Sequence, residues 1–233
     1  MIIIVQLAKQ FANFSLSSLR SLRLCSSKNM NNRLTQQIQF IVEIDTLKNI
    51  LRQTKLTNNS RRENSAEHSW HLAMMAIILA EYAEPEVDII KAIKMLLIHD
   101  LIEIDAGDTF CYDVKGNSDK AEREIKAANR IFGLLPIEQA KELRGLWEEF
   151  EESQSATAKF AIALDRLQPL LQNQQNQGGT WKIHNITENL VRKRMSPVQE
   201  ASPILGKLVE EIIVDCIAAG YLQQEQLAEV NPR

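Results

Sequence analysis

The sequence contains few residues that interrupt helices, with only eight glycines and six prolines among 233 residues. Glycine and proline are the residues that most strongly destabilise the interior of a helix, so their scarcity favours long helices. A stretch of about 20 consecutive apolar residues, which a membrane-spanning helix needs, is also missing. The sequence therefore predicts a helical protein that does not bind a membrane.

Cysteine is scarce as well, and Cys25, Cys111 and Cys216 are scattered along the chain. An odd number of cysteines without metal-ligand spacing is typical of a reducing compartment rather than of a disulfide framework. The net charge of −3 gives no reason to expect a nucleic acid polymer as a partner. We therefore expect a cytoplasmic protein.

Acidic residues are missing from residues 1–42, which carry five basic residues. An acid-free segment with serine, leucine and arginine is typical of an organelle transit peptide. The alternative interpretation is an upstream start codon or a disordered tail, because Met30 stands just before the first amphipathic segment. Under either interpretation we exclude residues 1–29 from the fold, and we expect one domain over 34–222 and a tail over 223–233.

Apolar residues recur every three or four positions in most of the remaining chain, as they do in amphipathic helices. We predict helices over residues 34–54, 66–82, 87–104, 119–132, 136–152, 156–171, 187–194 and 204–219. Ser65 is the predicted N-cap of the second helix, since its hydroxyl can accept a hydrogen bond from the first turn. Because no strand pattern appears, the predicted fold class is all-α.

Histidine is limited to four residues, and two of them lie with carboxylates on otherwise apolar helices. His68 is in the first turn of helix 66–82, His99 and Asp100 are near the end of helix 87–104, and Asp165 lies between leucines on helix 156–171. A buried carboxylate is energetically costly unless it is paired or binds a metal. Two imidazoles and two carboxylates suit a divalent Mn, Co, Fe or Zn ion.

Each of these residues also has an ordinary explanation. A histidine at the start of a helix is usually a cap or a surface residue, and Asp165 followed by Arg166 is compatible with a simple ion pair. These explanations do not account for the presence of all four residues on apolar helices. Spacing alone leaves the choice between them and a metal site open.

A resemblance to a known family carries the interpretation further. The order of His68, His99-Asp100 and Asp165 resembles the H…HD…D signature of the HD-domain metal-dependent phosphohydrolases. The stretches "RRENSAEHSWHLA" and "HDLIEIDAGDTF" are similar to the branch that contains 5′-deoxynucleotidases. The resemblance covers roughly residues 34–220 and implies an all-α bundle with a metal site at its centre.

The resemblance also implies roles for individual residues. The positions that match the metal ligands of the family are His68, His99, Asp100 and Asp165. Glu103 matches an acid that positions water or shuttles a proton, and it shares a helical face with His99 because the two are four residues apart. Asp108, after a turn at Gly107, matches a second acid near the scissile phosphate.

Substrate phosphate requires cationic groups. Arg52 matches an arginine that contacts phosphate or sugar in the family, and Arg61 and Arg62 precede His68 in a loop from which a guanidinium can reach a monoester. The alternative for the Arg61 and Arg62 pair is a solvent-exposed loop. We expect His71 to support the site or to lie in the core, because the family pattern uses only His68.

Together these observations predict a phosphatase that acts on a small-molecule phosphate ester, with a (deoxy)nucleoside 5′-monophosphate as the substrate implied by the resemblance. One alternative is another HD-type hydrolase that acts on a nucleoside triphosphate or a phosphodiester. The other is a non-catalytic helical binding protein. The apolar closing helices and the resemblance further favour a homodimer.

Overall fold

The computed structural model describes residues 32–113 and 115–225, and most of these residues are helical. The first half comprises α2 (Asn32–Ile44), η1 (Asp45–Asn49), β1 (Leu51–Lys55), β2 (Arg62–Asn64), α3 (Ser65–Ile78), η2 (Ala80–Tyr82), α4 (Ile89–Ile98), η3 (His99–Ile102) and α5 (Glu103–Ala106). The second half comprises α6 (Lys120–Phe132), α7 (Ile137–Glu152), α8 (Ala156–Gln175), α9 (Gly179–Ile183), α10 (Glu188–Ala201) and α11 (Pro203–Ala218). The predicted all-α class is confirmed.

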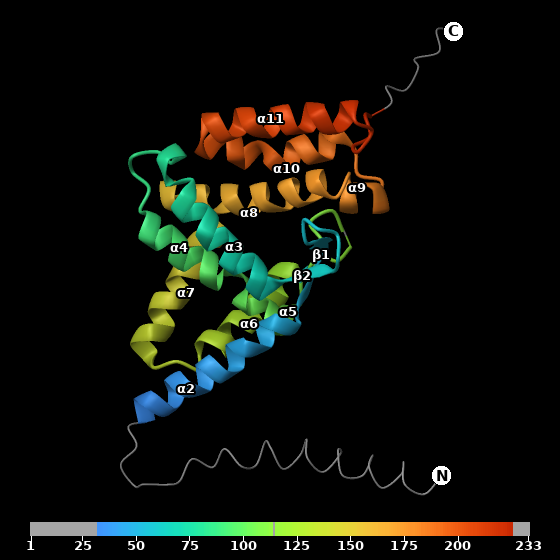
Figure 1. Cartoon of the computed structure of the whole chain (residues 1–233). Coiled ribbons are helices and arrows are strands. Elements are labelled where there is room, and N and C mark those ends of the chain that lie inside the picture. The colour runs from blue at the N-terminus through green and yellow to red at the C-terminus, as the bar shows by residue number, and fades with distance from the viewer. Residues whose placement is uncertain (1–31, 114, 226–233) are drawn as a thin grey trace, which may run out of the picture.

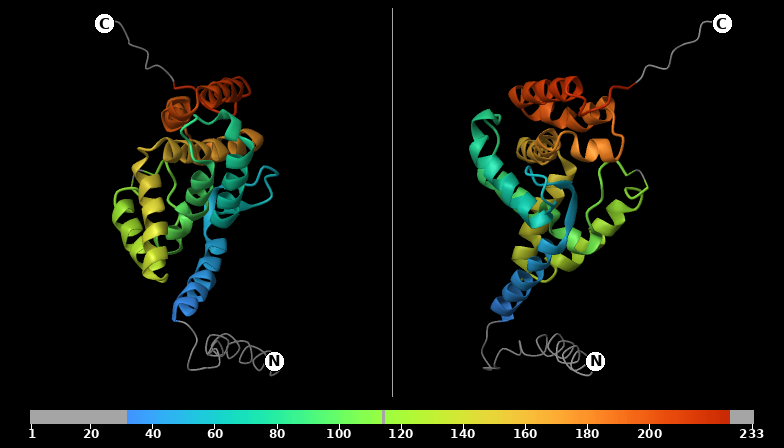
Figure 2. Two further views of the ribbon diagram at one scale, coloured as in Figure 1. Left: turned by 90° about the vertical axis from the view of Figure 1, so that its left-hand side faces the viewer. Right: turned by 45° about the vertical axis from the view of Figure 1, so that its right-hand side comes forward.

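The helix α8 forms the centre of the bundle. It packs against α10 on one side and against α3, α4 and α7 on the other (Figure 1). The helices α10 and α11 pair with each other and form an outer layer over α8, which the rotated views also show (Figure 2). Residues of α8 therefore face both halves of the bundle, and polar side chains on it can meet residues from several other helices.

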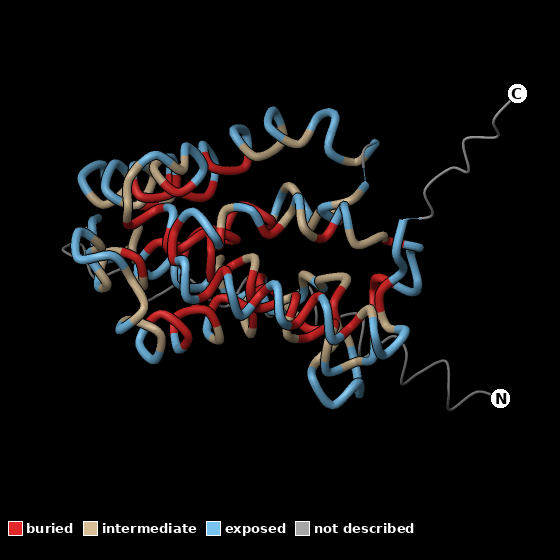
Figure 3. Tube along the Cα trace, turned by 90° about the horizontal axis from the view of Figure 1, so that it is seen from above, coloured by how far each residue is buried: buried red, intermediate tan, exposed pale blue. Residues whose placement is uncertain are grey.

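The core is continuous through the bundle. Seen from above, buried segments line the inside of the helices and exposed segments form the outer turns (Figure 3). The largest fully buried apolar side chains include Phe132, Phe160, Met95 and Ile213, which come from α6, α8, α4 and α11. Burial of apolar side chains from distant parts of the sequence is the main force that holds these helices together.

The small sheet was not predicted, and the first predicted helix is too long. Residues 34–54 were expected to form one helix, but α2 ends at Ile44 and the chain continues as η1 and then β1. Strand β1 pairs antiparallel with β2, and Leu51 lies opposite Asn64. The apolar spacing of this segment fits a helix, yet hydrogen bonds between the two strands determine the conformation of its last residues.

The predicted cap of α3 is wrong by one residue. Asn64, not Ser65, is the N-cap: its side chain accepts a hydrogen bond from the backbone N–H of Glu67, and the Glu67 carboxylate accepts one from the backbone N–H of Asn64. This reciprocal capping box leaves the Ser65 hydroxyl free for another contact. Ser65 is fully buried and points into the bundle.

The predicted helix 87–104 is divided into three pieces. The regular helix α4 ends at Ile98, and His99 begins the tighter turn η3, which leads into the short α5. A 3₁₀ turn has a different rotation per residue from an α-helix, so it changes the direction in which successive side chains point. Both predicted ligands of this segment, His99 and Asp100, lie in that turn and are buried.

In the described part of the chain, no helix combines the length and the apolar character that crossing a bilayer requires. The predicted N-terminal extension, residues 1–29, lies outside the described residues, and so does most of the predicted tail. The backbone of Gln223 forms a bridge with Thr187, so the ordered chain extends slightly past the predicted end of the domain.

Candidate metal centre

Three of the predicted ligands meet inside the bundle. His68 comes from the first turn of α3, His99 from η3 and Asp165 from the middle of α8. One ligand atom of each residue lies within 4.8 Å of the ligand atoms of the other two. Side chains that are 31 and 66 residues apart in the sequence therefore surround one small volume.

The distances within the cluster are short. Asp165 Oδ1 lies 3.0 Å from His68 Nε2 and 3.7 Å from His99 Nε2. Asp100, the fourth predicted ligand, places Oδ1 3.0 Å from His99 Nε2. The four residues thus form a connected set of two imidazoles and two carboxylates, a combination that suits a divalent transition metal.

The other ring nitrogen of each histidine is held by a hydrogen bond on the far side of the ring. His68 Nδ1 donates to Gln168 Oε1 at 3.1 Å, and His99 Nδ1 donates to the carbonyl oxygen of Leu96 at 2.9 Å. In both residues Nε2 therefore faces the cluster, as it does in histidines that bind metals. His99 Nε2 is buried and makes no hydrogen bond among the described residues, although carboxylate oxygens of Asp100 and Asp165 lie 3.0 and 3.7 Å away, so a cation fits this position.

The charges around the cluster also favour a cation. Burial opposes a charge on His99, but the carboxylates of Asp100 and Asp165 outweigh it and raise the pKa of His99 to about 9. Burial and the charge of Asp100 raise the pKa of Glu103 well above its usual range. Both groups lie near an excess of negative charge in a poorly solvated site, and a bound divalent metal would compensate that charge.

A chain of hydrogen bonds supports His68 from behind. Gln168 Nε2 donates to both carboxylate oxygens of Glu63, at 2.9 and 3.1 Å, while Gln168 Oε1 accepts the His68 proton. His71 Nδ1 lies 3.3 Å from the same amide nitrogen. The sequence pattern gave no signal for Glu63, whereas Gln168 follows Asp165 by three residues and therefore shares its helical face.

Glu103 is held close to the predicted ligands. Its Oε2 accepts a hydrogen bond of 2.7 Å from the hydroxyl of Ser65, the buried residue beside the cap of α3. Asp108 follows Gly107, whose φ of 75° lies in the region that glycine adopts without strain. The structure thus brings the two predicted acids to the wall of one pocket.

Arg52 is the only one of the three predicted arginines that reaches this pocket. Its Nη1 donates to Asp100 Oδ2 at 2.8 Å and lies 4.0 Å from Asp108 Oδ1, while its Nη2 lies 4.0 Å from Asp165 Oδ1. Burial lowers the pKa of Arg52, but the surrounding carboxylates more than offset this effect and raise it. The strand β1, which sequence analysis interpreted as helix, is the element that aims this guanidinium at the ligands.

Arg61 and Arg62 do not reach the pocket. Arg61 is exposed and forms two hydrogen bonds with the carboxylate of Glu67, at 2.5 and 2.8 Å. Arg62 donates to the backbone carbonyls of Leu51 and Arg52, which fastens β2 to β1. A role of these two arginines in substrate binding stays a prediction that the geometry does not favour.

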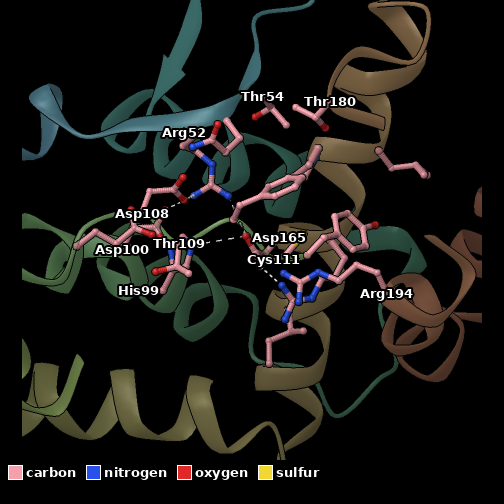
Figure 4. Close-up of a pocket in the computed structure, with 18 of the residues that line it drawn as sticks. Arg52, Thr54, His99, Asp100, Asp108, Thr109, Cys111, Asp165, Thr180 and Arg194 are labelled. Carbon is pink, nitrogen blue, oxygen red and sulfur yellow. Dashed lines mark hydrogen bonds and ion pairs between the residues drawn. The ribbon is translucent and has the colours of Figure 1, made fainter. Parts of the chain in front are cut away.

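The pocket beside the cluster extends from the predicted ligands to α10 (Figure 4). Its wall includes several apolar and aromatic side chains: Ile102, Phe110, Tyr112, Phe150, Ile162, Leu170, Trp181 and Met195. Its wall also includes three cationic residues that sequence analysis did not assign to the site: Lys120, Arg166 and Arg194. They come from α6, α8 and α10, and only the tertiary structure brings these helices to one cavity.

The chain is similar to one known protein family and to solved structures. The sequence pattern of the HD domain family matches residues 44–205. A solved structure described as a predicted metal-dependent phosphohydrolase from Magnetospirillum magnetotacticum MS-1 is 53% identical. That likeness covers 83% of this chain and 100% of the solved chain, with a TM-score of 0.79.

Curated relatives carry the name 5′-deoxynucleotidase HDDC2. The protein from Homo sapiens is 32% identical over 136 residues, which are 58% of this chain and 65% of the human protein, just under two thirds of its length. The protein from Xenopus laevis is 28% identical over 198 residues, which are 84% of this chain and 91% of that protein. The residues that match the HD domain family, 44–205, contain the elements that supply the cluster.

Proposed function

This chain belongs to the HD domain family, and we propose that it is a metal-dependent phosphohydrolase that releases phosphate from a small phosphomonoester. The observation that carries the proposal is the convergence of His68, His99 and Asp165, whose ligand atoms lie within 4.8 Å of one another. The pocket beside them has both predicted catalytic acids, Glu103 and Asp108, in its wall. The similarity to a metal-dependent phosphohydrolase supports the same reaction.

In this proposal the metal ligands are His68, His99, Asp100 and Asp165. When bound, a divalent cation supplies Lewis-acid chemistry and lowers the pKa of a coordinated water toward neutrality. Mn, Co, Fe and Zn all suit the mixed nitrogen and oxygen donors.

The remaining polar residues of the site act on protons and charge. Glu103 is oriented by the Ser65 hydroxyl, and its carboxyl group takes up or returns a proton during hydrolysis. Asp108 lines the same pocket, 4.0 Å from Arg52 Nη1, where it orients water or the leaving oxygen. Arg52 holds Asp100 by a direct hydrogen bond and limits the repulsion among the carboxylates.

The substrate that fits this site best is a (deoxy)nucleoside 5′-monophosphate. The relatives named 5′-deoxynucleotidase support this class. The pocket offers aromatic side chains, among them Phe110, Tyr112 and Trp181, beside polar groups such as Thr54 and Thr180. An aromatic wall accommodates a planar base, while hydroxyl groups can bind the polar edge of a base or sugar.

Phosphate release from a panel of substrates tests the proposal. We expect purified protein loaded with Mn or Co to hydrolyse nucleoside 5′-monophosphates faster than the matching triphosphates and faster than phosphodiesters. Faster turnover of triphosphates or diesters would reject the monoesterase assignment. Absence of any phosphoester hydrolysis by the metal-loaded protein, together with unchanged behaviour of His99→Ala, would instead favour a non-catalytic binding protein.

We also propose that the protein forms a homodimer. Large apolar side chains are exposed along α3, where Trp70, Ile77 and Ile78 are 63%, 52% and 66% exposed, and on the closing helices, where Ile204 is 62% exposed. Contiguous exposed apolar surface often marks a protein interface. Light scattering coupled to gel filtration should give twice the chain mass, and a mass of one chain at all concentrations would contradict the proposal.

A reducing, cytoplasmic location is our proposal for the compartment. It is supported by Cys111 and Cys216, which are free thiols in the structure. In this proposal the partner is a small phosphate ester, and neither a nucleic acid polymer nor a membrane is part of the function. Fractionation of cells should place the protein in the cytosolic fraction, and recovery in an organelle would favour the targeting interpretation of residues 1–29.

A further inference from the structure

The pocket beside the candidate metal centre has four cationic side chains in its wall, and they differ in how much of their charge is already compensated. They are Arg52, Lys120, Arg166 and Arg194. A phosphate ester carries negative charge, so it is attracted most strongly by cations that are not already bound to carboxylates. The contacts of each cation therefore indicate where the substrate anion binds.

Arg52 is enclosed by carboxylates. It donates to Asp100 at 2.8 Å and lies 4.0 Å from Asp108 and from Asp165. Its side chain is only 14% exposed, so few of its donors are available to a ligand. The carboxylates therefore offset much of its charge, and the predicted contact of Arg52 with phosphate or sugar stays a prediction.

Lys120 is also compensated. Its ammonium group lies 3.3 Å from the carboxylate of Glu124, one helical turn further along α6. Glu151 of α7 is another acid of the same part of the pocket wall. An anion that entered here would meet two carboxylates as well as the lysine, which makes this part of the wall a poor site for phosphate.

Arg166 and Arg194 are different. Arg166 Nη1 donates to Asp165 Oδ2 at 3.1 Å, and no other ion pair of this side chain occurs among the described residues. Arg194 is partly buried, yet its guanidinium has no ion pair with any carboxylate of the part of the chain that the structure describes. In the view of Figure 4, Asp165 lies between Arg52 and Arg194.

We propose that Arg194 of α10, together with Arg166 of α8, forms the subsite that binds the phosphate oxygens of the substrate. The proposal rests on the proposed phosphomonoesterase function and adds the residues that recognise the anion. A partly buried guanidinium in a pocket wall favours an anionic ligand, and its planar fork matches two oxygens of a phosphate group. Arg166 contacts the predicted ligand Asp165 at 3.1 Å, so an anion bound here is adjacent to the candidate metal centre.

Inorganic phosphate, the product of the proposed reaction, is the probe for this subsite. We expect Arg194→Gln to weaken phosphate binding measured by calorimetry about tenfold or more, because it removes a charge-assisted pair of hydrogen bonds. The KM for a nucleoside monophosphate should rise by a similar factor. Phosphate binding within twofold of the unsubstituted protein would overturn the proposal.

Arg192→Gln is the matched control. Arg192 lies on α10 two residues before Arg194, but it pairs with Glu188 and Glu210 and is not part of this pocket wall. We expect Arg192→Gln to bind phosphate as the unsubstituted protein does. Equal weakening by both substitutions would show a general charge effect and would contradict the proposed subsite.

A measurement on the unsubstituted protein avoids any dependence on folding of a variant. Phenylglyoxal modifies accessible arginine side chains, and mass spectrometry locates the modified residue. We expect inorganic phosphate to slow the modification of Arg194 several-fold and to leave the modification of the exposed Arg61 unchanged. Equal modification of Arg194 with and without phosphate would contradict the proposal.

The outcomes also separate this subsite from the proposed function. If phosphate binding depends on Arg194 while no phosphomonoester is hydrolysed, the subsite stands and the proposed function fails. If monophosphates are hydrolysed and Arg194→Gln leaves both KM and phosphate binding unchanged, the proposed function stands and the subsite fails.

Discussion

The two helices α8 and α11 are both long and both bury a full side, but they bury different kinds of side chain. Along α11 the buried residues are apolar or small, as Leu205, Val209 and Ile213 illustrate, and its charged residues are exposed. Along α8 the buried residues include Asp165 and Gln168 as well as apolar side chains. The difference coincides with position, since α8 lies at the centre of the bundle and α11 in its outer layer.

Buried polar groups destabilise a fold unless they have partners, so their presence on α8 needs an explanation. Asp165 contacts both histidines, and Gln168 connects His68 to the buried carboxylate of Glu63. These contacts give the polar groups of α8 partners and hold two imidazoles in defined orientations. Helix α11 therefore contributes to the stability of the fold, whereas α8 contributes both to stability and to the candidate metal centre.

Removing the charge of Asp165 on α8 should reduce activity more than any other substitution considered. We expect Asp165→Asn to reduce phosphate release about 1,000-fold or more, because loss of the shared ligand removes several kcal/mol of transition-state stabilisation. Initial rates with a nucleoside monophosphate and added Mn measure the effect. A loss of less than tenfold is incompatible with Asp165 as a metal ligand.

Asp105→Asn is the control for this substitution. Asp105 is an exposed residue of α5 that accepts a hydrogen bond from Arg130 at 2.7 Å. It has no predicted role in the reaction. The account predicts an activity within twofold of the unsubstituted protein.

A substitution on α11 should affect stability and leave chemistry intact. Ile213 is 1% exposed, and we expect Ile213→Ala to lower the free energy of unfolding by about 3 kcal/mol through lost burial and a residual cavity. Urea denaturation measures this change, and the kcat of the folded protein should be unchanged. A large loss of kcat without loss of stability would abolish the distinction between the two helices.

The hydrogen bonds behind His68 should have a smaller effect, on metal affinity. We expect Gln168→Leu to weaken Mn or Co binding about 10- to 100-fold, because residues that orient a ligating histidine contribute this much to metal affinity. Competition with a chelator measures the dissociation constant. Gln172→Leu is the control, since Gln172 contacts Glu63 but not His68, and equal weakening by both would contradict a role through His68.

Removing an ion pair at the surface should change the free energy of unfolding only slightly. Lys91 of α4 donates to Glu149 of α7 at 2.8 Å, and this contact lowers the pKa of Glu149 below its usual value of 4.5. A lowered pKa in the folded state stabilises the protein above pH 4.5, and the contribution is lost as the pH falls through the lower value. We expect Glu149→Gln to cost about 0.5 kcal/mol at pH 7.

Urea denaturation at pH 7 and near pH 4 tests this dependence. The difference in unfolding free energy between Glu149→Gln and the unsubstituted protein should shrink at the lower pH. A difference that grows on acidification would contradict the assigned sign.

Helices whose apolar spacing determines their packing could be predicted from the sequence. The predicted helices 119–132, 136–152 and 204–219 agree with α6, α7 and α11 to within about one residue. Prediction failed where tertiary contacts override the spacing. The apolar pattern continues past Ile98, yet the chain tightens into η3, and the pattern continues past Ile44, yet strand pairing follows.

In the candidate site, too, some residues could be predicted from the sequence and others could not. His68, His99 and Asp165 were identifiable because ionisable residues on apolar helices are unusual, and the structure brings them together. Arg194 gave no such signal, because an arginine on an amphipathic helix is ordinary. Only the packing of α10 on α8 shows that it reaches the pocket.

The most direct test of the metal centre is a crystal structure of the protein soaked with Mn, with the ion located by its anomalous scattering. The account predicts one strong peak within coordination distance of Nε2 of His68 and His99 and of carboxylate oxygens of Asp100 and Asp165. A peak at another place, or one that contacts only a single member of this set, would show that these residues do not form a metal centre.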